Sequence, residues 1–302
     1  MNMNTNDIYT WANDMYPLIK KRFDERYASR MNAISQVAGI VTGADATYEL
    51  RGLGGYGELP VYEGGELSHG DDSKAYLTTV TPVERALAIP VSYKRAKLDI
   101  VGEADKTGVR LADSAYMTVL NEFYRVFGNA FATVGADGVP FASRSHPISK
   151  GGDDQTFSNL LDLELSVSAI AEAQRHAAEF VTADGLPFTA NFDLLLISPE
   201  LEPVAREICG EDALVTPFGT VGGTPYGMKY MVVGGGGEGF TGSKWAIADS
   251  MLLPEVLKLV YITEPTVVVS PRDNPLMTDY IAYVDFAFGF GDARPILFSD
   301  PI

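Results

Sequence analysis

DKTGVRLADSAYMTVLNEFYRVFGNAF, residues 105–131, is the stretch of the sequence that decides the fold. Its apolar residues recur every three or four positions, which is the spacing of one face of an α-helix. The members of this stripe are Ala112, Ala115 or Tyr116, Val119 or Leu120, Phe123, Val126 or Phe127, and Ala130. At 1.5 Å per residue the helix is about 40 Å long, enough to cross a whole small domain. We therefore predict a long amphipathic helix, called the spine, at the centre of the fold.

The second half of the chain alternates helical and strand patterns. Residues 163–180 show a second amphipathic pattern, which stops at the turn Asp184-Gly185. Residues 192–197 are nearly all apolar, as in a strand buried on both faces. Ser198-Pro199-Glu200 then supplies an N-cap, a proline and a first-turn acid for a short helix ending at Cys209. Further strands are expected at 227–233, 244–248, 256–262, 266–269, 279–290 and 296–298. This order predicts an α+β fold.

Two segments precede the spine. Residues 7–27 form an amphipathic helical pattern that is too short for a domain and predicts an arm. Residues 46–98 are rich in β-forming residues interrupted by glycines, with a polar tip at 68–74, and predict a long hairpin. A two-stranded hairpin with so few apolar residues is marginally stable alone. We therefore expect it to lie on a neighbouring molecule.

Composition excludes several classes of protein. With 40 acidic against 23 basic residues the net charge is −17, so the average surface repels phosphate and disfavours sequence-specific nucleic-acid binding. One cysteine, Cys209, excludes an intrachain disulfide framework and fits a reducing cytoplasm. The start of the chain has no signal-peptide pattern, and no apolar run approaches the roughly 20 residues that span a bilayer. We expect a protein made in the cytoplasm and without a membrane contact.

A glycine motif after an apolar strand is the strongest nominal sign of a ligand site. Gly234, Gly236 and Gly239 have the G-x-G-x-x-G spacing of dinucleotide-binding loops. That function requires a helix to open at the last glycine, so that backbone N–H groups face a pyrophosphate. Residues 240–248 instead have the pattern of another strand, with Trp245 and Ile247 on one face. The motif therefore predicts a hairpin loop, and a nucleotide-binding enzyme using residues 234–239 is the alternative.

Histidine and cysteine offer little further chemistry. The histidines are His69, His146 and His176, and no pair has the spacing of metal ligands. A hydrolase built on Cys209 with His146 or His176 is conceivable, because such groups assemble in space. The end of an amphipathic helix is, however, where a small buried apolar residue is the usual occupant. We predict no catalytic residue, no cofactor and no metal.

A series of short strings, in a fixed order between about residues 100 and 290, completes the pattern. They are Gly135-Ala-Asp-Gly-Val-Pro-Phe141, Ser145-His146-Pro147, Phe157-Ser-Asn-Leu160 opening the second helix, Leu194-Leu-Leu-Ile-Ser-Pro-Glu-Leu201, Thr224-Pro-Tyr-Gly-Met228, Val232-Val233 and Trp245-Ala-Ile-Ala-Asp249. With the order arm, hairpin, spine, second helix and mixed α+β part, the chain resembles the Hong Kong ninety-seven type of phage capsid fold. Within that fold it is similar to head proteins of the Mu type.

The resemblance implies a division of the α+β chain into an arm, an extended loop, a peripheral domain with the spine helix, and an axial domain. The implied segments are the N-terminal arm at 1–45, the extended β-hairpin loop at 46–98, the peripheral domain at 99–158, the axial domain at 159–254, the return strands of the peripheral domain at 255–290, and the C-terminal strand of the axial domain at 291–302.

The resemblance also implies a function. It indicates a major capsid protein of a tailed phage, a structural protein that forms hexamers and pentamers of an icosahedral shell around double-stranded DNA. The implied partners are further copies of the chain, a portal, decoration proteins and a separate scaffolding protein, since no long charged helical region precedes the arm. The implied location is the virion capsid, assembled in the bacterial host cytoplasm.

Contacts between subunits are expected from the hairpin and the arm. The candidates are Tyr62, Glu63, His69, Lys74 and Tyr76 in the hairpin and Trp11 in the arm. An encapsulin-like nanocompartment shell is an alternative with the same fold. A tail or tube protein is a further alternative, against which the long spine helix argues.

Overall fold

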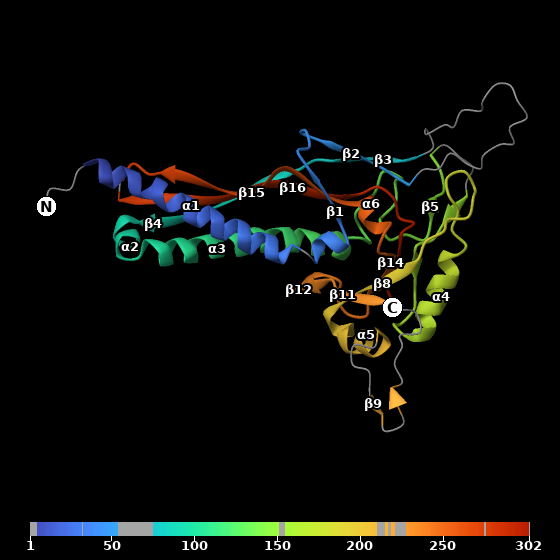
Figure 1. The fold of residues 1–302 in the computed structure, drawn as a ribbon. Coiled ribbons are helices and arrows are strands. Elements are labelled where there is room, and N and C mark those ends of the chain that lie inside the picture. The colour runs from blue at the N-terminus through green and yellow to red at the C-terminus, as the bar shows by residue number, and fades with distance from the viewer. Residues whose placement is uncertain are drawn as a thin grey trace, which may run out of the picture.

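The computed structural model shows an elongated body joined to a more compact one (Figure 1). Helices α1 (Thr5–Arg30) and α3 (Ile100–Gly128) run along the elongated body with the long strands β15 (Leu257–Pro271) and β16 (Met277–Phe290). The compact body holds a second sheet and α4 (Val167–Ala177). The structure describes residues 5–31, 33–53, 75–150, 155–209, 215–216, 219–220, 228–274 and 276–301.

The spine is confirmed as α3, but it begins at Ile100 instead of residue 105. The Asp99 carboxylate accepts a hydrogen bond from the backbone N–H of Gly102 at 2.9 Å and caps the helix at this earlier point. Of the alternatives in the predicted stripe, the fully packed members are Ala115, Val119 and Phe127. Burial of one continuous stripe is what an amphipathic helix requires to be stable in a domain.

The predicted helix at 7–27 is confirmed as α1, and it packs along α3 of its own subunit. A Cβ atom on Gly108 would lie 2.7 Å from the Ile19 carbonyl oxygen, so glycine there allows the two helices to approach closely. Phe23 is fully buried beside this contact. Arg26 forms an ion pair with Asp113 at 2.9 Å on the rim. The described part of the arm is therefore built into the elongated body.

A four-stranded sheet completes the elongated body. Its order is β1 (Gly39–Thr42), β15, β16 and β4 (Val83–Ser92), with β1 parallel to β15 and the other pairs antiparallel. Alternate residues of β16, including Tyr280 and Phe286, are buried against the helices. The helices cover one face of the sheet (Figure 1).

Two strand predictions in this sheet need correction. The strands predicted at 256–262 and 266–269 form the single strand β15, which begins at Leu257 and stays continuous because it absorbs two register shifts around Thr263. Residues 86–93, assigned to the hairpin, belong mostly to β4, which pairs with β16 and not across the hairpin tip. Residues 93–98 form the short helix α2 (Tyr93–Leu98). Both errors concern pairing with distant residues, which a local pattern does not contain.

The compact body is built around a five-stranded sheet that is buried on both faces. α4 and α5 (Glu202–Cys209) cover one face, and α3 packs on the other. The apolar strand predicted at 192–197 is confirmed at its centre, and Trp245 and Ile247 share the face toward α4. The sheet order is β11 (Lys229–Val232), β8 (Phe192–Ile197), β14 (Trp245–Asp249), β17 (Ile296–Ser299) and β7 (Leu160–Leu161).

The string Phe157-Ser-Asn-Leu160 does not open the second helix. Leu160 and Leu161 form β7, which pairs in parallel with β17. The helix α4 begins only after Ser166, whose hydroxyl oxygen accepts a hydrogen bond from the backbone N–H of Ala169 at 3.1 Å. The apolar residues before Ser166 thus serve the edge of the sheet.

No helix in the described ranges has both the length and the apolar character needed to cross a bilayer. The remaining described elements are short. These elements are η1 (Ile34–Gln36), β2 (Tyr48–Arg51), β3 (Leu77–Val80), β5 (His146–Pro147), β6 (Thr156–Phe157), η2 (Pro199–Leu201), β9 (Val215–Thr216), β10 (Gly219–Thr220), β12 (Gly234–Gly235), β13 (Glu238–Gly239) and α6 (Leu253–Val256).

Candidate functional site at the base of the hairpin

Strands β2 and β3 form the described base of the predicted hairpin. They pair antiparallel, with Tyr48 opposite Val80 and Arg51 opposite Leu77. Val80 and Leu50 are buried against Val260 of β15, on the face of the four-stranded sheet opposite the helices. This base is therefore fixed to the body of the subunit.

Asp292 ties the hairpin base to the C-terminal segment. Its Oδ2 atom accepts hydrogen bonds from the backbone N–H of Leu53, at 3.0 Å, and from Nη1 of Arg294, at 2.7 Å. Oδ1 accepts a third bond from the Arg294 backbone N–H at 3.0 Å. A carboxylate with this many donors is held in one orientation, so the point where the chain enters the hairpin is held as well.

Arg294 extends this anchor into both bodies. The side chains of Arg294 and Asp292 are 6% and 7% exposed, so the ion pair is buried. Nε donates to the Val181 carbonyl oxygen at 2.8 Å, and Nη2 donates to the Ile148 carbonyl oxygen at 2.5 Å. The guanidinium also lies over the Phe157 ring, 5.1 Å from its centroid. One side chain thus joins the loop before residue 150, the turn after α4 and the hairpin base.

Tyr76 closes the other end of the hairpin base. Its hydroxyl donates to the Ser149 carbonyl oxygen at 3.1 Å, and its carbonyl oxygen accepts from the Gly52 N–H at 3.0 Å. Burial is the main reason that the pKa of the Tyr76 hydroxyl is raised, and the nearby Asp137 charge adds to it. The two ends of the hairpin base, Leu53 and Tyr76, are therefore both hydrogen-bonded to the body of the subunit.

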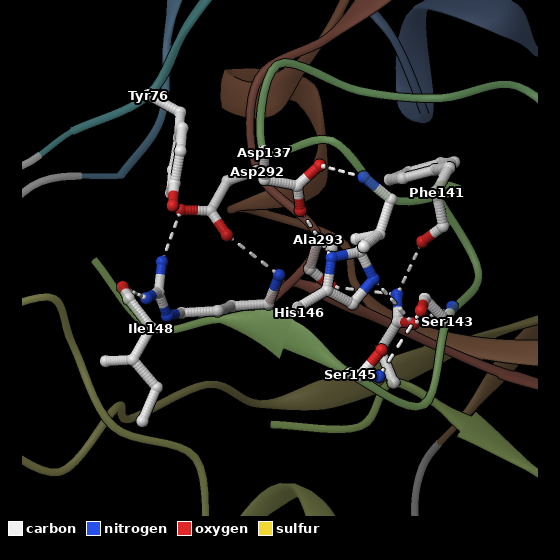
Figure 2. A network of polar contacts seen from close by, with 12 residues as sticks. Tyr76, Asp137, Phe141, Ser143, Ser145, His146, Ile148, Asp292 and Ala293 are labelled. Atoms are coloured by element: carbon white, nitrogen blue, oxygen red, sulfur yellow. Dashed lines mark hydrogen bonds and ion pairs between the residues drawn. The ribbon is translucent and has the colours of Figure 1, made fainter. Parts of the chain in front are cut away.

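A second polar cluster lies directly beneath, around the buried His146 (Figure 2). Its Nδ1 atom is 2.6 Å from Oδ2 of Asp137, and its Nε2 atom is 3.1 Å from Oδ1 of Asn159. Asn159 is fully buried and donates through Nδ2 to the Phe141 carbonyl oxygen at 2.8 Å. The His146 ring stacks on Phe157 at 5.1 Å, the same ring that Arg294 covers. The two clusters share one aromatic support.

The two clusters, Asp292 with Arg294 and His146 with Asp137 and Asn159, together form a structural clamp at the hairpin base. They leave little room for a substrate. The space between Tyr76, His146 and Arg294 is a cavity of about 30 Å³, far below the hundreds of Å³ of ordinary small-molecule sites. Each ring nitrogen of His146 faces an oxygen acceptor, so the imidazole is fully engaged in the clamp. The buried bonds fix the position of the hairpin base.

The glycine motif at 234–239 is a tight turn, as predicted. β12 and β13 pair antiparallel, and Gly236 and Gly237 have positive φ values of 63° and 89°, which favour glycine. No helix opens after Gly239, where Phe240 leads toward β14. Arg125 of the spine bonds to Glu238 at 3.0 Å and holds the turn against α3. The dinucleotide-loop alternative lacks the helix on which it depends.

The two histidines and the cysteine weighed for catalysis have structural surroundings in the described chain. Cys209 is buried in the cluster between α4, α5 and the five-stranded sheet. His176 Nε2 bonds to the Ser158 carbonyl oxygen at 2.9 Å, and His146 belongs to the clamp. His69 lies outside the described residues.

The structure describes two of the residues predicted to contact a neighbouring subunit, Trp11 and Tyr76. Within the subunit, Trp11 is 6% exposed, and its ring packs against Tyr93 at 5.8 Å in the core below α1. Its place in the apolar stripe of α1, and not on the polar face, is the reason. Tyr76 is half-buried at the hairpin base. The other candidates, Tyr62, Glu63, His69 and Lys74, lie outside the described residues.

Most of the clamp escaped sequence reasoning. Asp292, Arg294 and Asn159 are single polar residues without a periodic pattern, and their partners are far away in the chain. The available signals were the Asp137-Gly138 turn and the Ser145-His146-Pro147 string, which identified the loop but not its partners. Gly138 has a φ of 83°, as such a turn requires.

The comparison with family models decides the family. A model described as "Phage capsid protein" matches residues 75–297, well over half of the chain and parts of both bodies. The chain belongs to this phage capsid protein family. The capsid protein is a structural shell subunit, and the encapsulin-like alternative is not favoured over a phage shell. No curated protein matches its sequence.

Solved capsid structures share the fold of this capsid protein. The capsid of an empty GTA particle matches with a TM-score of 0.54, 11% identity and coverage of 90% of both chains. The procapsid of satellite phage P4 matches with a TM-score of 0.52, 13% identity and coverage of 92% of this chain and 95% of the other. The capsid of cyanophage P-SCSP1u matches with a TM-score of 0.51, 11% identity and coverage of 89% of this chain and 88% of the other. The predicted α+β phage capsid fold is confirmed.

Proposed function

We propose that this capsid protein assembles into hexamers and pentamers of an icosahedral shell that encloses the double-stranded DNA of a tailed phage. Membership of the phage capsid family over residues 75–297 is the observation that carries the proposal. In this proposal the chain is not an enzyme: it assembles in the host cytoplasm and its final location is the virion capsid.

The shape of the subunit supports assembly by wrapping. Stable assemblies bury large surfaces, often beyond about 2,000 Å² per interface. An elongated body and a long hairpin reach several neighbours with little added volume. The bonds of Asp292 to Leu53 and Arg294 fix the base of the predicted hairpin on the subunit, which supports a role of the hairpin in contacts with a neighbour.

The proposed segments follow from the family fold. We assign the arm, extended loop, peripheral domain and axial domain as the resemblance implies, with α3 as the spine of the peripheral domain and the five-stranded sheet in the axial domain. The hairpin residues Tyr62, Glu63, His69 and Lys74 are proposed contacts to a neighbour.

Charge determines the proposed relation to DNA and to other proteins. A net charge of −17 keeps the wall from binding the genome tightly, so the DNA is held by enclosure and without sequence specificity.

We also propose a separate scaffolding protein, a portal and decoration proteins as partners. The solved P4 procapsid includes a size determination protein, which is an example of such a partner for that phage.

The content of the particles tests this function. We expect particles from producing cells to yield double-stranded DNA that survives nuclease treatment, because a closed shell keeps the nuclease out. Particles opened by heat before digestion are the control and should lose that DNA. Intact shells filled with a protein cargo and free of nucleic acid would instead identify a nanocompartment.

A further inference from the structure

In the part of the chain that the structure describes, one face of the four-stranded sheet, opposite α1 and α3, is largely open. Residues of β16 alternate, so that Tyr280, Ala282, Val284 and Phe286 are buried toward the helices and the odd-numbered residues point the other way. On the outer strand β4 the open face presents exposed side chains, among them Glu84. The hairpin base covers only the end of this face near Val260 and Ala287.

Asp285 is the exception on this open face. It is only 6% exposed, and its Oδ1 atom is buried without a hydrogen-bond partner. Glu84 stands directly opposite on β4, so two carboxylates face each other across the strands. Like charges in this position destabilise a sheet. A buried carboxylate that also lacks a donor costs still more free energy.

The described cation and hydroxyl donor nearest Asp285, on Arg85 and Tyr283, interact with other groups. Arg85 bonds to Glu122 at 2.8 Å and lies over the Phe286 ring, on the helix side of the sheet. The hydroxyl of Tyr283 is engaged with Glu84 and with Thr263, which is the residue opposite Asp285 on β15. Burial first, and Glu84 second, raise the pKa of Asp285, while Arg85 lowers it.

A neighbouring carboxylate on the same strand and face shows what is missing. Asp279 also has a buried, unbonded Oδ1 atom, but its Oδ2 atom is paired with Arg272 at 2.7 Å. Within the described ranges, an ion pair with a cation is present at Asp279 and is absent at Asp285. The pair of Glu84 and Asp285 has the charge of a site for an added cation, and the exposed Glu84 is the side from which a cation can approach.

We propose that Glu84 and Asp285 receive a lysine or arginine side chain from a second copy of the chain. The inference rests on the proposed shell function and deepens it by naming one receiving surface. A second copy is the occupant because every subunit carries the site, and in a shell every subunit is surrounded by copies of itself. A cation is also what subunits with a net charge of −17 need at their contacts.

The test compares Asp285→Asn with wild type and with the matched control Asp279→Asn. Asp285→Asn removes a charge without removing volume, and we expect its melting temperature to equal or exceed that of wild type at neutral pH. The sign follows from the raised pKa of Asp285. A carboxyl group whose pKa is higher in the folded than in the unfolded subunit destabilises the folded subunit when it is ionised at neutral pH. The protein concentration needed for shell assembly should rise about tenfold or more, because a buried cation loses its partner. Asp279→Asn should assemble like wild type.

Further arms decide between the outcomes. Glu84→Gln, at an exposed position, should fold normally and also weaken assembly; normal assembly of both Glu84→Gln and Asp285→Asn would overturn the proposal. Unfolding of Asp285→Asn with normal assembly of Glu84→Gln would make the site structural and also overturn it. Loss of wild-type assembly in EDTA, restored by calcium or magnesium, would identify a metal ion as the occupant instead. If wild type forms no shells at all, the shell function itself fails, and the inference that rests on it fails with it.

Discussion

Replacing residues 54–74 with a short Gly-Ser linker is expected to leave a folded subunit that no longer builds shells. The linker keeps β2, β3 and β4, and it joins Leu53 and Ala75, whose neighbours Gly52 and Tyr76 are already bonded at 3.0 Å. Shortening a loop changes its closure free energy by only about 0.6 kcal/mol per halving. The loss should therefore fall on contacts with neighbours. Circular dichroism and thermal melting report folding, and electron microscopy reports assembly.

A variant with residues 54–74 in scrambled order is the control for length and composition. It should fold and also fail to assemble, because the contacts depend on sequence. Unfolding of the linker variant would place the segment in the core of the subunit. Normal shells from it would contradict our account of the hairpin.

Val119→Asp is expected to unfold the subunit itself. Val119 is fully buried on the spine, in the cluster between α3 and both sheets. An unpaired carboxylate there should lower the free energy of unfolding by several kcal/mol, on the order of 4 or more. Chemical denaturation measured by circular dichroism gives this value directly.

Met117→Asp is the matched control for the spine. It lies two positions away on the same helix, and its side chain is 46% exposed. The same substitution there should change the free energy of unfolding by less than about 0.5 kcal/mol. Equal destabilisation by both variants would mean that helix propensity, and not burial of the stripe, explains the effect.

The sequence predicted those parts of the fold that depend on local periodicity. The spine follows from apolar residues spaced for one helix face, and the strand at 192–197 from an apolar run with a cap directly after it. The tight turn at 234–239 follows from glycines that adopt positive φ. Each of these signals is contained in a window of fewer than 30 residues.

Features that depend on distant residues were missed or misplaced. β4 was assigned to the hairpin because its alternation suits either partner, and only its register with β16 shows which one it has. The bonds from Arg294 to Ile148 and Val181 cross more than 100 residues of chain. The packing of Trp11 on Tyr93 joins α1 to residues about 80 positions later, which no local pattern contains. Pairing, and not propensity, decided these cases.

The oligomeric state of the purified wild-type protein is the most direct test of the account. Sedimentation velocity, followed by negative-stain electron microscopy of the fastest fraction, measures it without any variant. We expect closed shells, or free hexamers and pentamers that close into shells as protein concentration rises. A stable monomer at every protein and salt concentration would contradict the claim that this chain is a shell subunit.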